Sequence, residues 1–385
     1  MLRYLDAGES HGKGMAVIVE GMPYGVPVTP SRIERELARR RLGYGRGARM
    51  SLEKDAVEIF SGVRDGRTLG SPVCLLVMNA ERERWKEVMA VEGEGVGEPL
   101  TAPRPGHADL AGALKYGTYD LRDILERSSA RETVGRVCAG ALAKALLECL
   151  GIGVFSHVVS VGKVSARGKR KAPGLEDIRG ADADPMRCLD PEASARMVKE
   201  VDSAREEGDS LGGTFEVVAY GLPAGLGSHV HWDRRLDARL AAAVMGIQAV
   251  KGVEIGEGFR LAKLRGSQAG DVIRYRRGRG FYRLTNRSGG LEGGMTTGEP
   301  LVLRGAMKPI PTLASPLHTV DVVSKEKVRA AVERSDVCAV PAAAVIAESV
   351  VAMVLADALL EKLGGDSLEE IRERLDRVRQ VQRDF

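Results

Sequence analysis

The chain has 385 residues, enough for one large domain or two to three ordinary ones, and its 44% hydrophobic and 29% charged residues are typical of a globular protein with a sizeable core. A formal net charge of +4 and an aromatic content of 4% argue against a stacking platform for single-stranded nucleic acid. The five cysteines form no CxxC pair, so we expect reduced thiols in the cytoplasm and neither a disulfide framework nor a zinc site.

The first part of the chain predicts two strands separated by a helix. Residues 1–10 carry no apolar run, so we expect no secretory signal. The β-rich runs 15–22 and 71–79 are bounded by Gly or Pro, which is typical of strands. Between them, Thr29 can cap a helix that has Pro30 in its first position.

The middle of the chain predicts two helices and two strands. A helix fits residues 132–151, which show an apolar stripe at helical spacing and end in Gly151. The β-rich runs 153–164 and 213–223 predict strands. The helical spacing recurs over 234–252, which predicts a second helix there.

The last part of the chain predicts a core segment followed by a charged helix. Residues 337–356 are the most apolar run, but Pro341 and Glu348 interrupt it, so we interpret it as buried core and not as a membrane span. Residues 364–385 open with a capping box and continue with much charge and one narrow apolar seam. Such a helix packs on the body of the protein or on a sister subunit.

The order of these elements predicts a mixed α+β fold. Strands and helices do not alternate in short βα units, so a doubly wound sheet or a barrel is not favoured. Residues 163–185 are the best loop candidate, and the sequence shows neither a fixed-period repeat nor a Pro/Ser/Gly linker. We therefore expect a single compact domain over residues 1–385.

The stretch GESHGKG, residues 8–14, looks like a phosphate-binding P-loop but lacks its spacing. A P-loop has four residues between its glycines and then Lys followed by Ser or Thr. Here Gly8 and Gly12 enclose three residues, and Lys13 is followed by Gly14. We therefore exclude a P-loop nucleotide hydrolase.

Two histidines lie in Gly-flanked turns with polar neighbours, His11 in GESHG and His107 in RPGHAD. A lone histidine is more often structural than catalytic, but two such histidines near arginines favour acid–base chemistry near neutral pH. His229 and His231 are a weak candidate for a metal pair, and we expect no metal site.

Several stretches are suited to anions. The arginine-rich runs 38–49 and 274–287 fit phosphate or carboxylate groups, because guanidinium binds these bidentately. The stretch RDILERSSARET precedes the predicted helix at 132–151 and presents Arg127, its two following serines and helix N–H groups together. Each of these also has a purely structural reading, as a solvated basic surface or a helix start.

Three further stretches complete the candidate site. GGLEGGMTTGEP (289–300) and MKPIPT (307–312) combine glycines, hydroxyls and Lys308, as loops around phosphate do. In RSDVCAVPAA (334–343), Asp336 precedes an apolar stretch, where a carboxylate is either a paired structural ion or a tuned base.

Taken in order, these stretches resemble the motifs of the chorismate synthase family. The matching stretches are GESHG, RPGHAD, RDILERSSARET, AVKGVEIG, GGLEGGMTTGEP, MKPIPT and RSDVCAVPAA. The resemblance spans residues 1 to about 360, nearly the whole chain.

The resemblance implies a lyase that converts 5-enolpyruvylshikimate-3-phosphate to chorismate and phosphate, the last common step of the shikimate pathway toward aromatic amino acids. The reaction is a 1,4-anti elimination without net redox change, yet it requires reduced FMN (FMNH2). Whether NADPH reduces that FMN on this protein or an external reductase does so stays open. The resemblance also implies a β-α-β sandwich with helices packed between antiparallel sheets, and a homotetramer without nucleic-acid or membrane partners.

Roles for single residues follow by motif. His11 would protonate the departing phosphate, His107 would steady the reduced flavin, and Asp336 would be the base that relays a proton through it. The implied FMN contacts are Arg127, Ser128, Ser129, Gln248, Ala249, Gly293, Lys308, Pro309, Ile310, Pro311, Thr312 and Arg334, the last also a candidate for the substrate. The implied contacts to substrate or NADP are Ser10, Arg40, Arg46, Arg49 and Arg131.

The sequence departs from the family pattern in two places. Ser335 stands where many members have His, and a serine lacks the imidazole that would relay a proton at that position. The arginine-rich arm reads RRLGYGRG where other members have Pro after the arginines, and we expect a changed loop there with binding retained.

Two alternative functions stay open from the sequence. An NADPH-consuming flavin oxidoreductase would use the same cofactor but would oxidise one flavin for each product. A nucleic-acid-binding protein would use the arginine runs to neutralise phosphates, but the modest net charge and the few aromatics argue against it.

Overall fold

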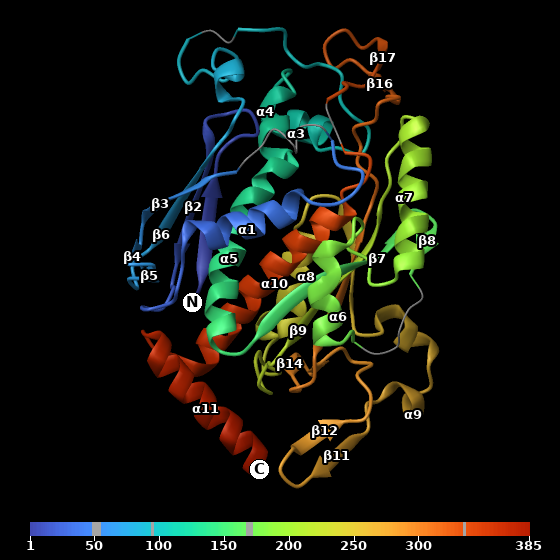
Figure 1. Cartoon of the computed structure of the whole chain (residues 1–385). Helices are drawn as coiled ribbons and strands as arrows, with labels where there is room; N and C mark the ends of the chain where they lie inside the picture. The colour runs from blue at the N-terminus through green and yellow to red at the C-terminus, as the bar shows by residue number, and fades with distance from the viewer. Residues whose placement is uncertain (48–54, 94–95, 167–171, 334–335) are drawn as a thin grey trace.

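The structure is a computed structural model that describes residues 1–47, 55–93, 96–166, 172–333 and 336–385. Two antiparallel sheets, with helices packed against them, form its largest part (Figure 1). The predicted α+β class is therefore confirmed.

The first sheet is formed mainly by the N-terminal part of the chain. Its strands, in spatial order, are β1 (Arg3–Ala7), β2 (Gly14–Glu20), β6 (Val73–Met78) and β3 (Val57–Ser61). The strands predicted at 15–22 and 71–79 are confirmed as β2 and β6. Val17 of β2 pairs with Leu75 of β6, and both side chains are fully buried on the face of the sheet that covers the core.

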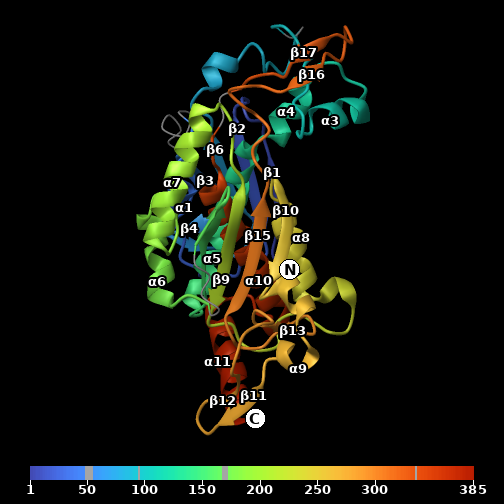
Figure 2. The ribbon, with the colours of Figure 1, turned by 90° about the vertical axis from the view of Figure 1, so that its right-hand side faces the viewer.

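The second sheet is also antiparallel, and Figure 2 shows three of its strands, β9, β15 and β10, side by side. Its strands, in spatial order, are β10 (Val250–Ile255), β15 (Leu301–Met307), β9 (Gly213–Tyr220), β7 (Gly153–Val161) and β8 (Val164–Ser165). The strands predicted at 153–164 and 213–223 are confirmed as β7, with its short continuation β8, and β9.

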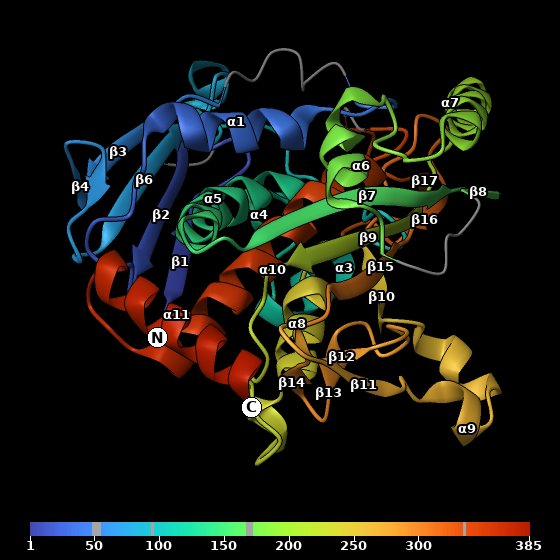
Figure 3. The ribbon, with the colours of Figure 1, turned by 60° about the horizontal axis from the view of Figure 1, so that its bottom comes forward.

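Helices α5 (Thr133–Cys149) and α10 (Val340–Leu363) lie between the two sheets, as Figure 3 shows. α5 packs against β1 and β2, α10 packs against β7 and β9, and the two helices pack against each other. α1 (Pro30–Arg41) packs against both helices. α10 is long and apolar enough to cross a membrane, but 89% of its most apolar window is buried, so the prediction of a core segment is confirmed.

Smaller elements surround these layers. The further helices are η1 (Arg82–Trp85), α3 (Asp109–Tyr116), α4 (Arg122–Ser128), η2 (Ala130–Glu132), α6 (Leu175–Arg179), η3 (Gly180–Ala183), α7 (Pro191–Glu206), η4 (Trp232–Arg234), α8 (Leu236–Met245), η5 (Gly258–Lys263), α9 (Gly266–Ala269) and α11 (Leu368–Asp384). The short strand pairs are β4 (Val63–Arg64) with β5 (Arg67–Thr68), β11 (Ile273–Arg276) with β12 (Gly280–Arg283), β13 (Leu291–Glu292) with β14 (Met295–Thr296), and β16 (His318–Val320) with β17 (Lys327–Arg329).

The predicted helix starts are found where the capping residues stand. Thr29 Oγ1 accepts a hydrogen bond from the N–H of Arg32 at 3.3 Å, and Pro30 occupies the first helical position of α1. Ser367 Oγ accepts in the same way from the N–H of Glu370 at the start of α11. The Glu370 carboxylate accepts from the N–H of Asp366 at 3.0 Å and so reaches one residue further back than in a capping box.

Two predictions about local structure were wrong in part. The helix predicted over 234–252 is found as α8 but ends at Met245; further along, Ala249 has a φ of +65° and Val250 begins strand β10. The apolar residues beyond Met245 point into the same core from a turn and a strand, which imitates helical spacing. The loop predicted over 163–185 contains α6 and η3, whose five and four residues are too few to show a period.

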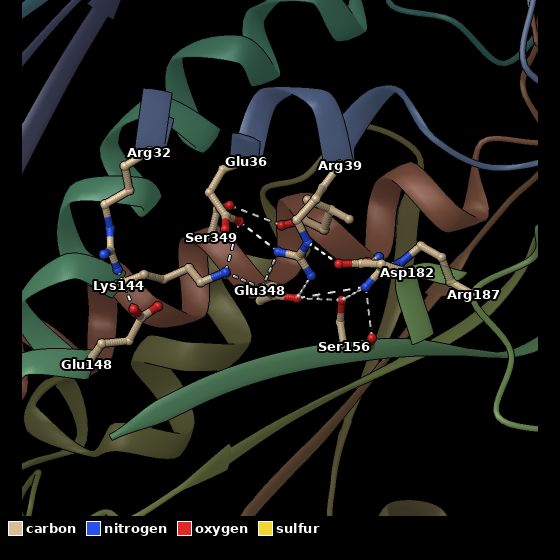
Figure 4. A network of polar contacts seen from close by, with 11 residues as sticks. Arg32, Glu36, Arg39, Lys144, Glu148, Ser156, Asp182, Arg187, Glu348 and Ser349 are labelled. Carbon is tan, nitrogen blue, oxygen red and sulfur yellow. Dashed lines mark hydrogen bonds and ion pairs between the residues drawn. The ribbon is translucent and has the colours of Figure 1, made fainter. Parts of the chain in front are cut away.

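A buried network of ion pairs joins the helix layer (Figure 4). Glu348 of α10 is fully buried and accepts hydrogen bonds from Arg39 of α1 at 2.6 and 3.1 Å, from Lys144 of α5 at 2.5 Å and from Ser156 of β7 at 2.8 Å. Glu36 of α1 accepts from the same two cations at 2.6 and 2.8 Å. The two carboxylates thus share two cations, which offsets the large cost of burying a lone charge.

The network continues toward Asp182, which pairs with Arg39 and with the buried Arg187. Burial opposes the ionisation of Glu348, but Arg39 and Lys144 outweigh it and hold the pKa of Glu348 below its usual range. Glu348, which interrupts the most apolar run of the sequence, is therefore a charged centre that joins three helices and a strand.

Candidate active site

A cavity of about 430 Å³ lies at one end of the layered structure, within the size range of small-molecule sites. Its lining comes from the β1–β2 turn, the end of α1, α4 with η2, the beginning of α5 and of α10, and the segments 104–108, 247–249 and 307–312. Residues from the start of α10, Ala339, Ala342, Ala343 and Ile346, form an apolar part of its wall.

Most of the predicted site residues line this one cavity. They are Ser10, His11, Arg40, Arg46, His107, Ser128, Ser129, Arg131, Gln248, Ala249, Lys308, Ile310, Pro311, Thr312 and Asp336. Residues up to about 330 positions apart in the sequence are thus brought together, as a shared site requires. Their chemical roles stay predictions.

Other predicted residues lie elsewhere. Arg127 does not line the cavity: 44% of its side chain is exposed, and it donates to the Asp6 carboxylate of β1 at 2.8 Å. Gly293 forms the turn between β13 and β14 with a φ of +58°, and Pro309 stands just outside the lining. Arg49 and Arg334, together with Ser335, lie outside the described residues.

His11 is held by a buried carboxylate. Glu126 of α4 accepts from the backbone N–H of His11 at 2.7 Å with one oxygen, and its other oxygen lies 2.8 Å from His11 Nδ1. The side chains are 8% and 4% exposed. Burial opposes the ionisation of Glu126, but the hydrogen bonds from His11 outweigh it and hold the pKa of Glu126 below its usual range.

His107, which also lines the cavity, has a similar carboxylate partner. Its Nδ1 lies 2.5 Å from Asp109 Oδ1, at the start of α3. Asp109 also accepts from the Arg104 side chain at 2.8 and 3.0 Å, and Arg104 in turn donates to Thr312 Oγ1 at 3.1 Å. Burial opposes the ionisation of Asp109, but hydrogen bonds from His107 and Arg104 hold the pKa of Asp109 well below its usual range.

Two buried arginines share a carboxylate behind the cavity wall. Arg131 donates to Asp55 Oδ1 at 2.6 Å and to Asn79 Oδ1 at 2.9 Å. Arg40 donates to Thr133 Oγ1 at 2.9 Å, and its Nη1 lies 3.8 Å from Asp55 Oδ2. Both residues also line the cavity, and these contacts fix guanidinium groups of a type that can hold an anion.

Asp336 stands at the entrance to α10 and is bound by the arm that follows α1. The backbone N–H of Gly47 donates to Asp336 Oδ1 at 2.7 Å, and Arg46 Nη1 lies 3.4 Å from Asp336 Oδ2. The predicted base and a predicted substrate-binding arginine are therefore direct neighbours.

Gln248 lines the cavity and has a buried polar atom beside it. Gln248 Nε2 donates to Glu132 Oε2 at 2.7 Å, and because a carboxylate only accepts, this contact fixes the orientation of the amide. Gln248 Oε1 is buried and has no hydrogen-bond partner among the described residues. It is suited to accept a hydrogen bond from a ligand.

Sequence reasoning missed the acids that stand behind the site. Asp109 and Glu126 lie inside the quoted motifs RPGHAD and RDILERSSARET, so their proximity to a histidine or a serine pair was a usable signal. Arg104 was a similar neighbour of His107. Asp55 follows a segment without a recognisable motif, and nothing in the sequence linked it to Arg131.

The comparisons with known proteins agree over nearly the whole chain. The family model described as chorismate synthase matches residues 2–360. The chain is 59% identical over 381 residues to a chorismate synthase of Moorella thermoacetica, with 99% of each chain covered. It is 58% identical over 385 residues to a chorismate synthase of Salinispora tropica, with 97% of each chain covered.

A solved structure is similar as well. A crystal structure of a chorismate synthase, 42% identical in sequence, superimposes with a TM-score of 0.82 and covers 100% of this chain and 99% of that one. The similarity extends to both the sheets and the helices, so sequence and fold lead to the same family.

Proposed function

The chain belongs to the chorismate synthase family of lyases, and from that premise we propose that it converts 5-enolpyruvylshikimate-3-phosphate to chorismate and phosphate by a 1,4-anti elimination with reduced FMN as cofactor. The observation that carries the proposal is the convergence of His11, His107 and Asp336 on one cavity that also presents Arg40 and Arg131. This combines proton donors and acceptors with anion-binding groups, as loss of a phosphate requires.

The arginines are proposed to bind the substrate anions. Arg40 and Arg131 present guanidinium N–H groups from a buried and fixed position, which favours bidentate binding of phosphate or carboxylate. Ser10 stands beside them in the lining, with its hydroxyl 3.1 Å from that of Ser129. Arg46 is proposed to contribute a further contact.

Proton transfer is proposed to use two residues on the lining. His11 gives a proton to the departing phosphate, because its contact with Glu126 keeps Nδ1 protonated and directs the exchange with a ligand to Nε2. Asp336 accepts the proton that the substrate loses in the reaction as a whole, and Arg46 with the Gly47 N–H keeps its carboxylate in place. His107, fixed by Asp109, is proposed to face the cofactor.

The residues present fit reduced FMN. The buried acceptor Gln248 Oε1 suits an N–H group of a flavin ring, and Ser128, Lys308 and Thr312 offer polar contacts on the same lining. When bound, reduced FMN supplies electron density transiently to the substrate and is regenerated, so the reaction has no net redox change. We extend the proposal to a β-α-β sandwich built as one domain, a homotetramer and a cytoplasmic location, with NADPH as a candidate reductant.

Anaerobic incubation with 5-enolpyruvylshikimate-3-phosphate and chemically reduced FMN tests the proposal. We expect many molecules of chorismate for each flavin, with the flavin still reduced at the end. Oxidation of one flavin for each product would favour the flavin oxidoreductase instead. Absence of chorismate under these conditions would contradict the proposed function.

A further inference from the structure

We infer that Glu126 is the positioning residue that makes His11 a proton donor: it fixes the imidazole so that Nδ1 carries hydrogen and Nε2 addresses the cavity. The inference rests on the proposed function, in which His11 protonates the departing phosphate. It concerns a residue that lies behind the lining of the cavity.

The geometry supports this because Glu126 uses both carboxylate oxygens on one residue. Oε2 accepts from the His11 backbone N–H at 2.7 Å, and Oε1 lies 2.8 Å from Nδ1. An ionised carboxylate has no proton to donate, so Nδ1 must carry the hydrogen. The two contacts together fix the backbone turn and the ring, which leaves little freedom for the ring to rotate about χ1 and χ2.

The other groups around His11 complete a cage. The Trp85 ring of η1 packs on the imidazole with a centroid distance of 4.2 Å and an interplanar angle of 39°. Arg122 of α4 lies over the Trp85 ring at 5.0 Å, and its Nη1 is 3.5 Å from Glu126 Oε1. Within the described part of the chain, Glu126 and Arg122 of α4 are therefore the charged groups seen beside His11 and Trp85, and Arg40 and Arg131 lie on the same cavity lining.

The contrast between the two histidines explains why His11 is the one suited to donate. Asp109, the partner of His107, also accepts two hydrogen bonds from the Arg104 side chain, at 2.8 and 3.0 Å. The positive charge of Arg104 therefore neutralises much of the negative charge of Asp109. Glu126 meets its arginine only at 3.5 Å. More of its negative charge therefore acts on the Nδ1–H of His11.

The decisive variant is Glu126→Gln. A glutamine has one acceptor oxygen, whereas His11 with a hydrogen on Nδ1 presents two donors toward this position, its backbone N–H and Nδ1–H. The amide can satisfy both groups of His11 only if Nδ1 loses its hydrogen. Arg122→Gln acts in the opposite direction, because it removes a positive charge that competes for Glu126.

Glu148→Gln is the matched control, since Glu148 also pairs with an arginine but lies outside the cavity lining.

Two measurements on the full-length protein test the inference. The first is nitrogen-15 NMR of the imidazoles in histidine-labelled protein without flavin, in which the His11 signals among six histidines are assigned by their loss in His11→Gln. We expect Nδ1 of His11 to carry hydrogen in the wild type and in Glu148→Gln, and to lose it in Glu126→Gln. The second is the pH dependence of single-turnover chorismate formation with reduced FMN.

The rate of chorismate formation should fall on the alkaline side of the pH profile, which we call the alkaline limb. We expect this limb to move to lower pH in Glu126→Gln and to higher pH in Arg122→Gln. Glu148→Gln should keep the wild-type limb. The rate of Glu126→Gln should fall by about 10² or more, the scale of a misprotonated catalytic histidine. A purely structural role predicts lower rates without opposite shifts. Unshifted limbs in both variants, or a hydrogen retained on Nδ1 in Glu126→Gln, would overturn the inference.

The two measurements distinguish a failure of the inference about Glu126 from a failure of the proposed function. If the wild type makes no chorismate, the proposed function fails, while the NMR result still decides whether Glu126 sets the hydrogen position on His11. If Glu126→Gln does not fold, the direction of the Arg122→Gln shift decides: a limb that moves to lower pH or does not move contradicts the inference.

Discussion

Arg46 Nη1 lies 3.4 Å from Asp336 Oδ2, so the arginine proposed for the substrate and the carboxylate proposed as the base form an ion pair. The pair joins the arm after α1 to the entrance of α10. A ligand that binds Arg46 therefore also changes the surroundings of Asp336, and the two residues are expected to act as a unit.

The first prediction concerns Arg46→Ala. The sequence alone predicts mainly weaker substrate binding, by about 1.5–3 kcal/mol for a charged hydrogen bond. Because Arg46 also contacts Asp336, we now expect kcat to fall together with the rise in KM. Steady-state kinetics of Arg46→Ala, Asp336→Asn and the double variant measure the coupling, and strictly additive effects would show that the two residues act independently.

The second prediction concerns Asp336→Asn, which keeps the shape of the side chain but removes a base. The Gly47 N–H can still donate to the amide oxygen, so the arm should stay in place. We expect substrate and reduced FMN to bind while steady-state chorismate formation falls by about 10² or more. Wild-type turnover in a folded Asp336→Asn protein would remove Asp336 from the mechanism.

The third prediction separates His107 from the acid behind it. In His107→Ala, Asp109 keeps its ion pair with Arg104, so folding should be little affected while turnover falls by about 10² or more. In Asp109→Asn, the buried Arg104 loses a charged partner, which should lower the free energy of unfolding by about 3–5 kcal/mol. Urea unfolding and turnover of both variants check this, and a His107→Ala protein with normal turnover would speak against a catalytic role.

The fourth prediction concerns the buried ion network. Glu348→Gln leaves Arg39 and Lys144 with too little negative charge in the core, so the free energy of unfolding should fall by about 3–5 kcal/mol. Glu148→Gln breaks a pair whose glutamate is 50% exposed and should cost less than about 1 kcal/mol. Equal losses in urea unfolding would mean that the network contributes no more than a surface pair.

The fifth prediction is the response of stability to acid. The pKa values of Glu348, Glu126 and Asp109 are held below their usual range in the folded protein by cationic or donor neighbours that outweigh burial. Their contribution to stability is therefore present above the unfolded pKa values, near 4, and is lost as pH falls below them through the lower pKa values of the folded protein. Urea midpoints should drop below about pH 5, and less steeply in Glu348→Gln; an unchanged slope in that variant would contradict the assignment.

The sequence predicted those parts of the structure that depend on local patterns. The β-rich run of β2 and the Thr29–Pro30 start of α1 depend on neighbours in the chain and were found where expected. The end of α8 was missed because Ile247 and Val250 belong to a turn and a strand that face the same core. For such residues, tertiary packing outweighs helical spacing.

The same distinction applies to the site. Motifs located His11, His107 and Asp336 because the loops that carry them have unusual local composition. They could not show that Arg46 contacts Asp336, or that Asp55 stands behind Arg131, because these pairs are 290 and 76 positions apart and depend on the packing of the layers. The acid that supports a catalytic group is found only once the chain is folded.

Arg39 and Arg40 are consecutive on α1 and so point about 100° apart around the helix. Arg39 enters the ion network of Glu348, and Arg40 lines the cavity. The network therefore sets the rotation of α1, and with it the angle at which Arg40 meets a bound anion. An exchange at Arg39 or Glu348 would change substrate affinity although neither side chain lines the cavity, so in the evolution of this protein the two positions are expected to change together or not at all.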